Sequence, residues 1–343
     1  MIDMLLDRGL LPDPVIRAGI RRIVKGRLSE QGAGGPKAQA ERASRLEATL
    51  RNAPIAIATD AANQQHYEVP SAFFAQVLGP HLKYSAGWWP DGVQSLFEAE
   101  HRMLALTTHR AGIEDGDTVL DLGCGWGAFG LHAAAAFPRS RIVAVSNSRS
   151  QAEFIRARAR ERRLANIEVV TADINTFEPG CTFDRIVSVE MLEHVRNHDA
   201  LFRRIAGWLE PRGRLFVHVF AHRQFPYLFE SRGASDWMAR HFFTGGMMPS
   251  ADWLTRFQDD LVVDARWTLG GEHYQRTAES WLGNFDSRRE AIDPILAEVY
   301  GAAESARWRT RWRVFFMACA EMFGYAGGNE WCISHLRFRK RNL

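Results

Sequence analysis

The feature that most constrains the fold is a regular alternation of apolar runs and helical patterns, which begins near residue 117. Apolar runs of strand length occur at 118–123, 141–147, 167–173, 183–190 and 214–221. The segments between them, such as SQAEFIRARARERRL, carry apolar residues at helical spacing. Because each parallel strand needs a crossover to reach the next one, this alternation predicts an α/β fold with a doubly wound, mostly parallel sheet. Two later runs, at 261–269 and 333–340, bring the expected sheet to seven strands.

The rest of the chain is expected to surround this sheet. We predict an N-terminal helical extension over residues 1–60 and a main domain over residues 61–343. Within the main domain, residues 222–256 are rich in Phe, Met and Trp and are predicted to cover the carboxyl edge of the sheet. Residues 276–328 are predicted to be helical, and QGAGGPK (31–37) is predicted to be a flexible joint.

Composition excludes several kinds of protein. The net charge of +3 is too small to predict a nucleic-acid partner. The 4 cysteines are scattered without a CxxC pair, so we expect neither a disulfide framework nor a metal site. No secretory signal and no apolar run of about 20 residues is present, so we expect a soluble, cytoplasmic protein. The basic helix near residues 13–28 is expected to pack on the main body; contact with anionic lipid is the alternative that we do not favour.

A glycine-rich loop, VLDLGCGWG (119–127), follows the first predicted strand. Glycine allows a backbone to pass close to a ligand or to adopt positive φ. The third glycine comes one residue too early for the dinucleotide pattern, and no acidic residue ends the second strand. A tight turn without a ligand would explain the loop alone. It would not explain why polar residues also follow the second and third strands, at Asn147 and Asp173.

This combination resembles the class I S-adenosylmethionine-dependent methyltransferases, which have a Rossmann-like fold. The resemblance implies that S-adenosylmethionine is the cofactor and S-adenosylhomocysteine its product. The residues that it assigns to cofactor binding are Asp121, Gly123, Gly125, Gly127, Asn147, Gln151, Asp173 and Ile174.

Two upstream motifs, HYEVPSAFF (66–74) and KYSAGWW (83–89), resemble those of the cyclopropane-fatty-acid synthase superfamily. In that superfamily the Tyr-Ser pair, here Tyr84 and Ser85, reaches the methionine end of the cofactor. The lipid synthases carry a cysteine where this chain has Ala86, and Gly-Met-Phe-Glu-His where it has EMLEH. GGEHYQRTAESWL and AEMFGYAGGNEW are also similar to the other branch, the coclaurine N-methyltransferase-like enzymes. The resemblance therefore favours methyl transfer to the nitrogen of a small amine.

An amine acceptor needs a base, because near pH 7 it is largely protonated and has no lone pair for attack. Glu190, Glu193 and His194 follow the fourth predicted strand, where open α/β sheets place their ligands. On one helical turn, these three residues would share a face. We expect the two carboxyls to raise each other's pKa and the imidazole to titrate near neutrality. They are the predicted catalytic residues.

The predicted acceptor is a small cyclic or aromatic amine, since aromatic side chains can surround a cation. The residues predicted to bind it are Trp88, Trp89, His218, Tyr274, Glu321, Phe323 and Trp331. In the simpler alternative, the tryptophans are core residues, and Glu190 and Glu193 are solvated residues in the first turn of a helix. The competing functions are a lipid-modifying enzyme that acts on unsaturated acyl chains with His218 as its base, and a catalytically silent cofactor-binding protein. A homodimer is compatible with this sequence.

Overall fold

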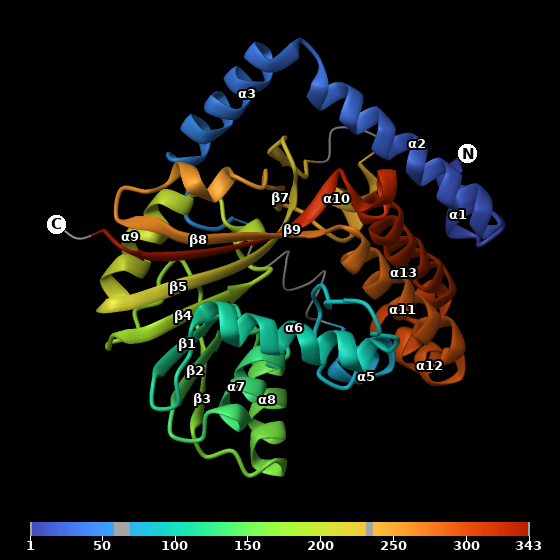
Figure 1. Ribbon diagram of the computed structural model, residues 1–343. Coiled ribbons are helices and arrows are strands. Elements are labelled where there is room, and N and C mark those ends of the chain that lie inside the picture. Colours follow the sequence, from blue (N-terminus) through green and yellow to red (C-terminus); the bar gives the residue numbers. More distant parts are fainter. Residues whose placement is uncertain (1, 58–68, 231–235, 342–343) are drawn as a thin grey trace.

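The computed structural model describes residues 2–57, 69–230 and 236–341, and its centre is one sheet (Figure 1). Within the described residues, this sheet has seven strands in the order β3-β2-β1-β4-β5-β9-β8. Their bounds are β1 (Thr118–Leu122), β2 (Arg141–Ser146), β3 (Ile167–Thr171), β4 (Phe183–Val189), β5 (Leu209–His222), β8 (Leu261–Gly270) and β9 (Trp331–Lys340). Each predicted strand is present, and the predicted fold class is confirmed.

The direction of the strands places the functional edge of the sheet. Strands β1 to β5 pair in parallel, and β9 runs antiparallel to both β5 and β8. The chain moves outward from β1 to β3 and then returns to place β4 beside β1. Ligands of doubly wound sheets bind at such a switch point, outside the carboxyl ends of the strands. The loops after β1 and β4 are therefore neighbours.

Helices cover both faces of the sheet. The helices α6 (Leu96–Ala111), α7 (Ala128–Ala136) and α8 (Arg149–Glu161) share their cores with alternate strand residues such as Val119 and Ile142. Helix α9 (His198–Trp208) packs with the other set, which includes Leu120 and Ile186. Successive strand residues point to opposite faces, so both faces of β1 are buried.

Helix α6 has strong start and stop signals. Ser95 Oγ accepts the Glu98 N–H at 3.2 Å, and Glu98 Oε2 accepts the Ser95 N–H at 3.3 Å, which forms a capping box. The helix stops at Gly112, whose φ of 67° suits glycine. These signals fix the last turn of α6, which carries Arg110, against the sheet.

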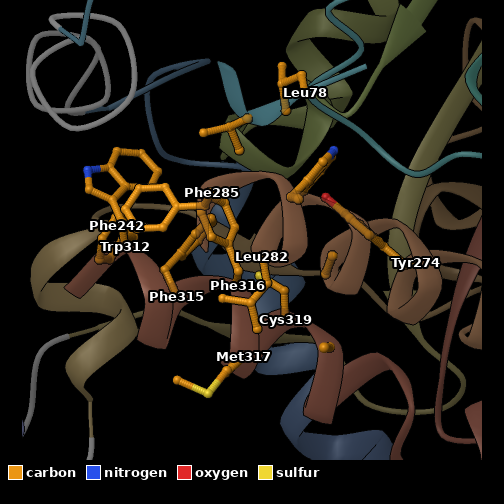
Figure 2. Packing of buried hydrophobic residues seen from close by; sticks show 14 of the residues in the cluster. Leu78, Phe242, Tyr274, Leu282, Phe285, Trp312, Phe315, Phe316, Met317 and Cys319 are labelled. Carbon is orange, nitrogen blue, oxygen red and sulfur yellow. The ribbon is translucent and has the colours of Figure 1, made fainter. Parts of the chain in front are cut away.

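A second, aromatic core lies beside the sheet (Figures 1 and 2). It joins α5 (Ser71–Val77), α11 (Glu272–Ser287), α12 (Arg289–Tyr300) and α13 (Ala302–Phe323). The segment predicted to cover the sheet edge contains β6 (Tyr227–Leu228), α10 (Trp237–His241), β7 (Met247–Met248) and the 3-10 helix η2 (Trp253–Arg256). Phe242 attaches this segment to α13, with its ring stacked on Phe315 at a centroid distance of 4.5 Å.

The N-terminal residues form α1 (Ile2–Asp7), α2 (Asp13–Gly32) and α3 (Gly35–Leu50). The predicted joint is short, because α2 continues to Gly32 and α3 begins at Gly35. Helix α2 packs along α13, as expected for the basic helix (Figure 1). The predicted boundary at residue 60 and residues 66–68 of the HYEVPSAFF motif lie outside the described residues. No helix in the described ranges is both long and apolar enough to cross a bilayer.

Candidate active site

Two small cavities flank the glycine loop after β1, with volumes of about 100 and 70 Å³. Gly123 and Gly125 line both of them. Gly125 has φ of 52°, and a Cβ there would point into open space. Gly123 has φ of 82°, and a Cβ there would collide with the side chain of Met191. The loop therefore exposes its backbone to the cavities at positions where a side chain is disfavoured.

The predicted cofactor residues divide into two groups. Asn147, Gln151 and Ile174 line the first cavity, and Tyr84, Ser85, Asp121 and Gln151 line the second. Gly127 and Asp173 line neither of these two cavities.

Both of these residues have structural roles. Gly127 starts α7 with φ of 80°, and a Cβ there would lie 2.7 Å from Cγ1 of Ile155 in α8. Asp173 closes a turn, because its Oδ1 accepts the N–H of Asn175 at 2.8 Å and its side-chain amide at 2.9 Å. Asp121 also has a structural role, because its Oδ2 accepts the Gly130 N–H at 3.0 Å and so joins β1 to α7. Burial raises the pKa of Asp121 to about 7.

Unpaired polar atoms show what kind of ligand the two cavities fit. Gln151 accepts the Ser146 hydroxyl at 2.7 Å, but its Nε2 is buried without a partner among the described residues. Thr107 Oγ1 and Trp126 Nε1 are also buried without a hydrogen-bond partner among the described residues, and both residues line the second cavity. A buried polar group without a partner costs about 1–3 kcal/mol. These groups and the open glycine loop fit a polar ligand such as S-adenosylmethionine.

A third, larger cavity of about 510 Å³ lies on the other side of the loop after β4. Its wall is mostly apolar and comes from β5 and from helices α2, α10, α11 and α13. Tyr274, Phe323 and Trp331, three of the residues predicted to bind the acceptor, line this cavity. The Tyr274 ring stacks on that of Phe323, with 4.2 Å between centroids. Trp331 donates its Nε1–H to the Tyr227 hydroxyl at 3.2 Å.

Four residues predicted to bind the acceptor do not line this cavity. Trp89 is buried in a small separate cluster and donates its Nε1–H to Thr277. Trp88 packs against the aromatic core. Glu321 bonds to Arg17 and Arg21 of α2 at 2.9 and 2.8 Å. Each is explained by packing or by an ion pair.

The fourth residue, His218, is fully buried and forms a hydrogen bond with Glu190, with 3.1 Å between His218 Nε2 and Glu190 Oε1. It therefore contacts the carboxylate rather than the contents of the cavity.

Among the described residues, Glu190 is the one common to the linings of these three cavities. Its φ of 48° lies in the left-handed region, which is unusual for a residue with a side chain. Besides the bond to His218, its Oε1 accepts the Ala86 N–H at 2.9 Å. Its Oε2 accepts the Tyr274 hydroxyl at 2.8 Å. These donors hold one carboxylate at the junction of the polar and apolar cavities.

The other two predicted catalytic residues differ from expectation. The 3-10 helix η1 (Leu192–His194) begins after Glu190, so Glu190 does not share a helical turn with Glu193 and His194. Glu193 is fully buried, accepts the Phe220 N–H at 2.8 Å, and lines none of the three cavities. His194 lines the first and third cavities and packs on Phe243, with 4.7 Å between ring centroids.

Burial dominates the electrostatics of this cluster. It raises the pKa of Glu190, although nearby Lys83 and the hydrogen bonds to Ala86 and Tyr274 oppose the shift. It raises the pKa of Glu193 well above its ordinary value, and Glu190 adds to that rise. Burial lowers the pKa of His194 to about 4. The prediction that this imidazole titrates near neutrality is wrong, because desolvation outweighs the attraction of Glu190.

Sequence reasoning missed Lys83, which lies in the KYSAGWW motif beside Glu190. Lys83 is buried and donates to Ser85 Oγ and, at 2.7 Å, to the Ala86 carbonyl. Burial lowers its pKa to about 8. The available signal was a lysine at the start of a motif that is rich in aromatic and small residues, since a buried ammonium requires partners.

Comparisons with known proteins agree with this geometry. The chain matches the family described as mycolic acid cyclopropane synthetase over residues 57–329. It is 40% identical over 341 residues to (S)-coclaurine N-methyltransferase of Thalictrum flavum subsp. glaucum, which covers 98% of this chain and 94% of that protein. Identity to the cyclopropane-fatty-acyl-phospholipid synthase of Escherichia coli (strain K12) is 27% over 262 residues, 76% of this chain and 63% of that one. A crystal structure of coclaurine N-methyltransferase bound to N-methylheliamine and SAH superposes with a TM-score of 0.95, at 37% identity and covering 99% of both chains.

Proposed function

Because the chain belongs to the mycolic acid cyclopropane synthetase family, in the branch that contains the coclaurine N-methyltransferases, we propose that it methylates the nitrogen of a small amine with S-adenosylmethionine. The observation that carries the proposal is the position of Glu190, whose carboxylate lies where the two polar cavities meet the apolar one. A carboxylate at that junction can attract a cationic amine and take its proton.

The third cavity indicates the kind of amine. Its volume of about 510 Å³ is in the range of small-molecule sites. Its apolar and aromatic wall, with Phe220, Tyr274 and Phe323 near Glu190, suits an amine attached to an aromatic or cyclic body. A relative of known structure holds N-methylheliamine, which supports this substrate class.

The cofactor side is supplied by the loops after β1, β2 and β3 and by the Tyr-Ser motif. When bound, S-adenosylmethionine supplies an electrophilic methyl group. The residues that would hold it line the two small cavities: Tyr84, Ser85, Gly123, Gly125, Asn147, Gln151 and Ile174. Gln151 would place its unpaired amide on a polar group of the ligand and so remove the cost of its burial.

The protein's own part in the reaction is the removal of a proton. The amine enters as an ammonium, and its N–H bond breaks as an O–H bond forms on Glu190, which leaves a lone pair on nitrogen. Burial raises the pKa of Glu190 toward that of the amine, so the transfer is less unfavourable than to an exposed carboxylate. His194 stays neutral at pH 7, because its pKa is about 4, and it can accept a hydrogen bond from the ammonium. Glu193 holds the main chain of Phe220 beneath this site.

The test offers the purified protein S-adenosylmethionine with a panel of cyclic benzylic amines and, separately, vesicles of monounsaturated phospholipid. The proposal expects amine products that are heavier by one methyl group. It expects Glu190→Gln to lose most of this turnover while it still binds S-adenosylhomocysteine. Glu161→Gln changes a charge on the surface end of α8 and serves as the matched control. Acyl chains that gain a methylene, with every amine unchanged, would replace this proposal with the lipid-modifying function.

A further inference from the structure

A continuous row of hydrogen bonds leads from α6 to Glu190 across the sheet. Arg110 Nη1, in the last turn of α6, lies 2.7 Å from His335 Nδ1 in β9. His335 Nε2 lies 3.0 Å from His218 Nδ1 in β5. His218 Nε2 lies 3.1 Å from Glu190 Oε1. The two histidines are direct partners in the β5–β9 register and are fully buried. We call these three residues the Arg110 row.

The guanidinium of Arg110 decides which nitrogens carry protons. An arginine side chain only donates hydrogen bonds, so His335 Nδ1 must accept. His335 then carries its proton on Nε2 and donates to His218 Nδ1. His218 in turn carries its proton on Nε2 and donates to Glu190. Both imidazoles are neutral, since burial, with Arg110 contributing, lowers the pKa of each well below its ordinary value.

We propose that Arg110, His335 and His218 are positioning residues that aim an N–H donor at Glu190 and hold its carboxylate ionised for proton transfer. This inference rests on the proposed function, since it concerns the same carboxylate. The row also excludes one route for the proton. A proton on Glu190 cannot leave through the histidines, because the outer end of the row is a guanidinium that cannot accept it. It must leave through the cavities.

The structure holds the outer end of the row in place. The guanidinium of Arg110 lies over the Trp267 ring of β8, at 4.9 Å from its centroid. Arg337 lies over the same ring at 5.8 Å and donates to the Arg110 carbonyl at 3.1 Å. Two strands and one helix therefore fix this side chain, which lines none of the three cavities described above.

The other groups that face Glu190 would remain when the row is broken. They belong to the Tyr-Ser motif, to η1, to α11 and to α13. These groups are Lys83, the Ala86 N–H, Glu193, His194, Tyr274 and Cys319. Ala86 and Tyr274 do not replace the His218 donor, because they are already bonded to Glu190 in the intact site, and Lys83 donates instead to Ser85 and the Ala86 carbonyl. Loss of the row therefore leaves Glu190 one donor short.

Paired variants test the row. Arg110→Met and His335→Leu remove the polar groups, whereas Arg110→Lys keeps a cation. His335→Gln keeps an oxygen that can accept and an amide that can donate. A hydrogen bond to a charged group changes its pKa by about one unit. We expect the acid limb of kcat/KM to move to higher pH by about one unit in Arg110→Met and His335→Leu. It should return toward the wild-type position in His335→Gln.

A second readout does not depend on turnover. In protein bound to S-adenosylhomocysteine, ¹³C NMR of labelled glutamate follows the titration of Glu190, assigned with Glu190→Gln, and ¹⁵N NMR reports which imidazole nitrogens are protonated. We expect protons on Nε2 of both His218 and His335, and a higher Glu190 pKa in Arg110→Met. A proton on Nδ1 of either histidine in the wild type would overturn the inference even if the variants failed to fold. An unchanged Glu190 titration in a folded Arg110→Met would do the same. A wild type that methylates no amine, yet shows the expected titration, would instead refute the proposed function alone.

Discussion

Glu190 pays a conformational cost for its position. Its φ of 48° would cost a residue with a Cβ about 1–2 kcal/mol relative to glycine. In this chain the bonds from Ala86, His218 and Tyr274 offset the strain, so the side chain is kept for its chemistry.

Replacement of Glu190 by glycine and by alanine should separate strain from chemistry. Both variants lose the carboxylate, so both should lose amine turnover. Glu190→Gly also relieves the strain, and we expect its free energy of unfolding to exceed that of Glu190→Ala by about 1 kcal/mol. Urea unfolding of the two variants with S-adenosylhomocysteine bound measures the difference. Equal stability, or a more stable alanine variant, would show that the left-handed backbone is not retained in solution.

His194 and Glu321 show what the sequence could not predict about single residues. The spacing of Glu190, Glu193 and His194 correctly indicated a cluster at the end of β4. It carried no information on burial, and burial sets the sign of the His194 pKa shift. Likewise the sequence showed that Glu321, in an apolar helix, must have a partner. Its partners are Arg17 and Arg21, which lie 304 and 300 positions away, rather than a substrate.

The same burial makes a prediction for His198. Its pKa is lowered to about 4, mainly by burial, while an unfolded histidine titrates near 6.5. The unfolded chain therefore binds more protons between these values, and the contribution of His198 to stability is lost as pH falls from 6.5 toward 4. In His198→Gln, which can still donate to the Leu192 carbonyl, the stability difference from wild type should change by up to about 3 kcal/mol over this range. Chemical denaturation at several pH values measures it, and parallel curves for both proteins would contradict it.

Among the elements, α2 has a role that its own sequence could not reveal. The strands were predictable because each carries its apolar pattern within a few residues. The cofactor loop was predictable because the spacing of its glycines is also a local feature of the sequence. Helix α2 has a short apolar stripe, which predicted only that it packs on something. In the structure Ile16, Ile20 and Val24 line the apolar cavity, so the helix forms part of the candidate amine site. That role depends on α11 and α13, whose sequences lie more than 200 positions away.

Ion pairs attach α2 to the neighbouring helices α11 and α13, which also line the apolar cavity. Arg17 bonds to Glu279 of α11 at 2.6 Å and to Glu321 of α13 at 2.9 Å. We expect Arg17→Met to raise the KM for the amine by about three- to tenfold with little change in kcat, because a partly buried pair contributes on the order of 1 kcal/mol. Affinity for S-adenosylhomocysteine should be unchanged, since α2 lines neither cofactor cavity. Arg22→Met, an exposed position on the same helix, is the matched control. A fall in kcat alone would show that α2 acts on chemistry rather than on binding.

At the scale of the whole molecule, the two ligands are expected to bind in two different cores. The residues that line the cofactor cavities come from the sheet edge and from α7 and α8, whereas those that line the apolar cavity come mainly from α2, α10, α11 and α13. The loop after β4 joins them, because Glu190 and His194 line cavities on both sides. Each ligand should therefore order its own core, and only this loop should respond to both.

Hydrogen exchange can test this division directly. S-adenosylhomocysteine alone should slow exchange in residues 123–127 and 146–151, which surround the two small cavities, and leave α2 and α10 unchanged. Addition of N-methylheliamine, the ligand held by the coclaurine N-methyltransferase structure, should then slow exchange in α2 and α10, because these helices line the apolar cavity. Residues 190–194 should respond to each ligand in turn. Protection of α2 by S-adenosylhomocysteine alone would mean that the two cores are coupled before the amine binds, and that the wall of the amine site is assembled by the cofactor.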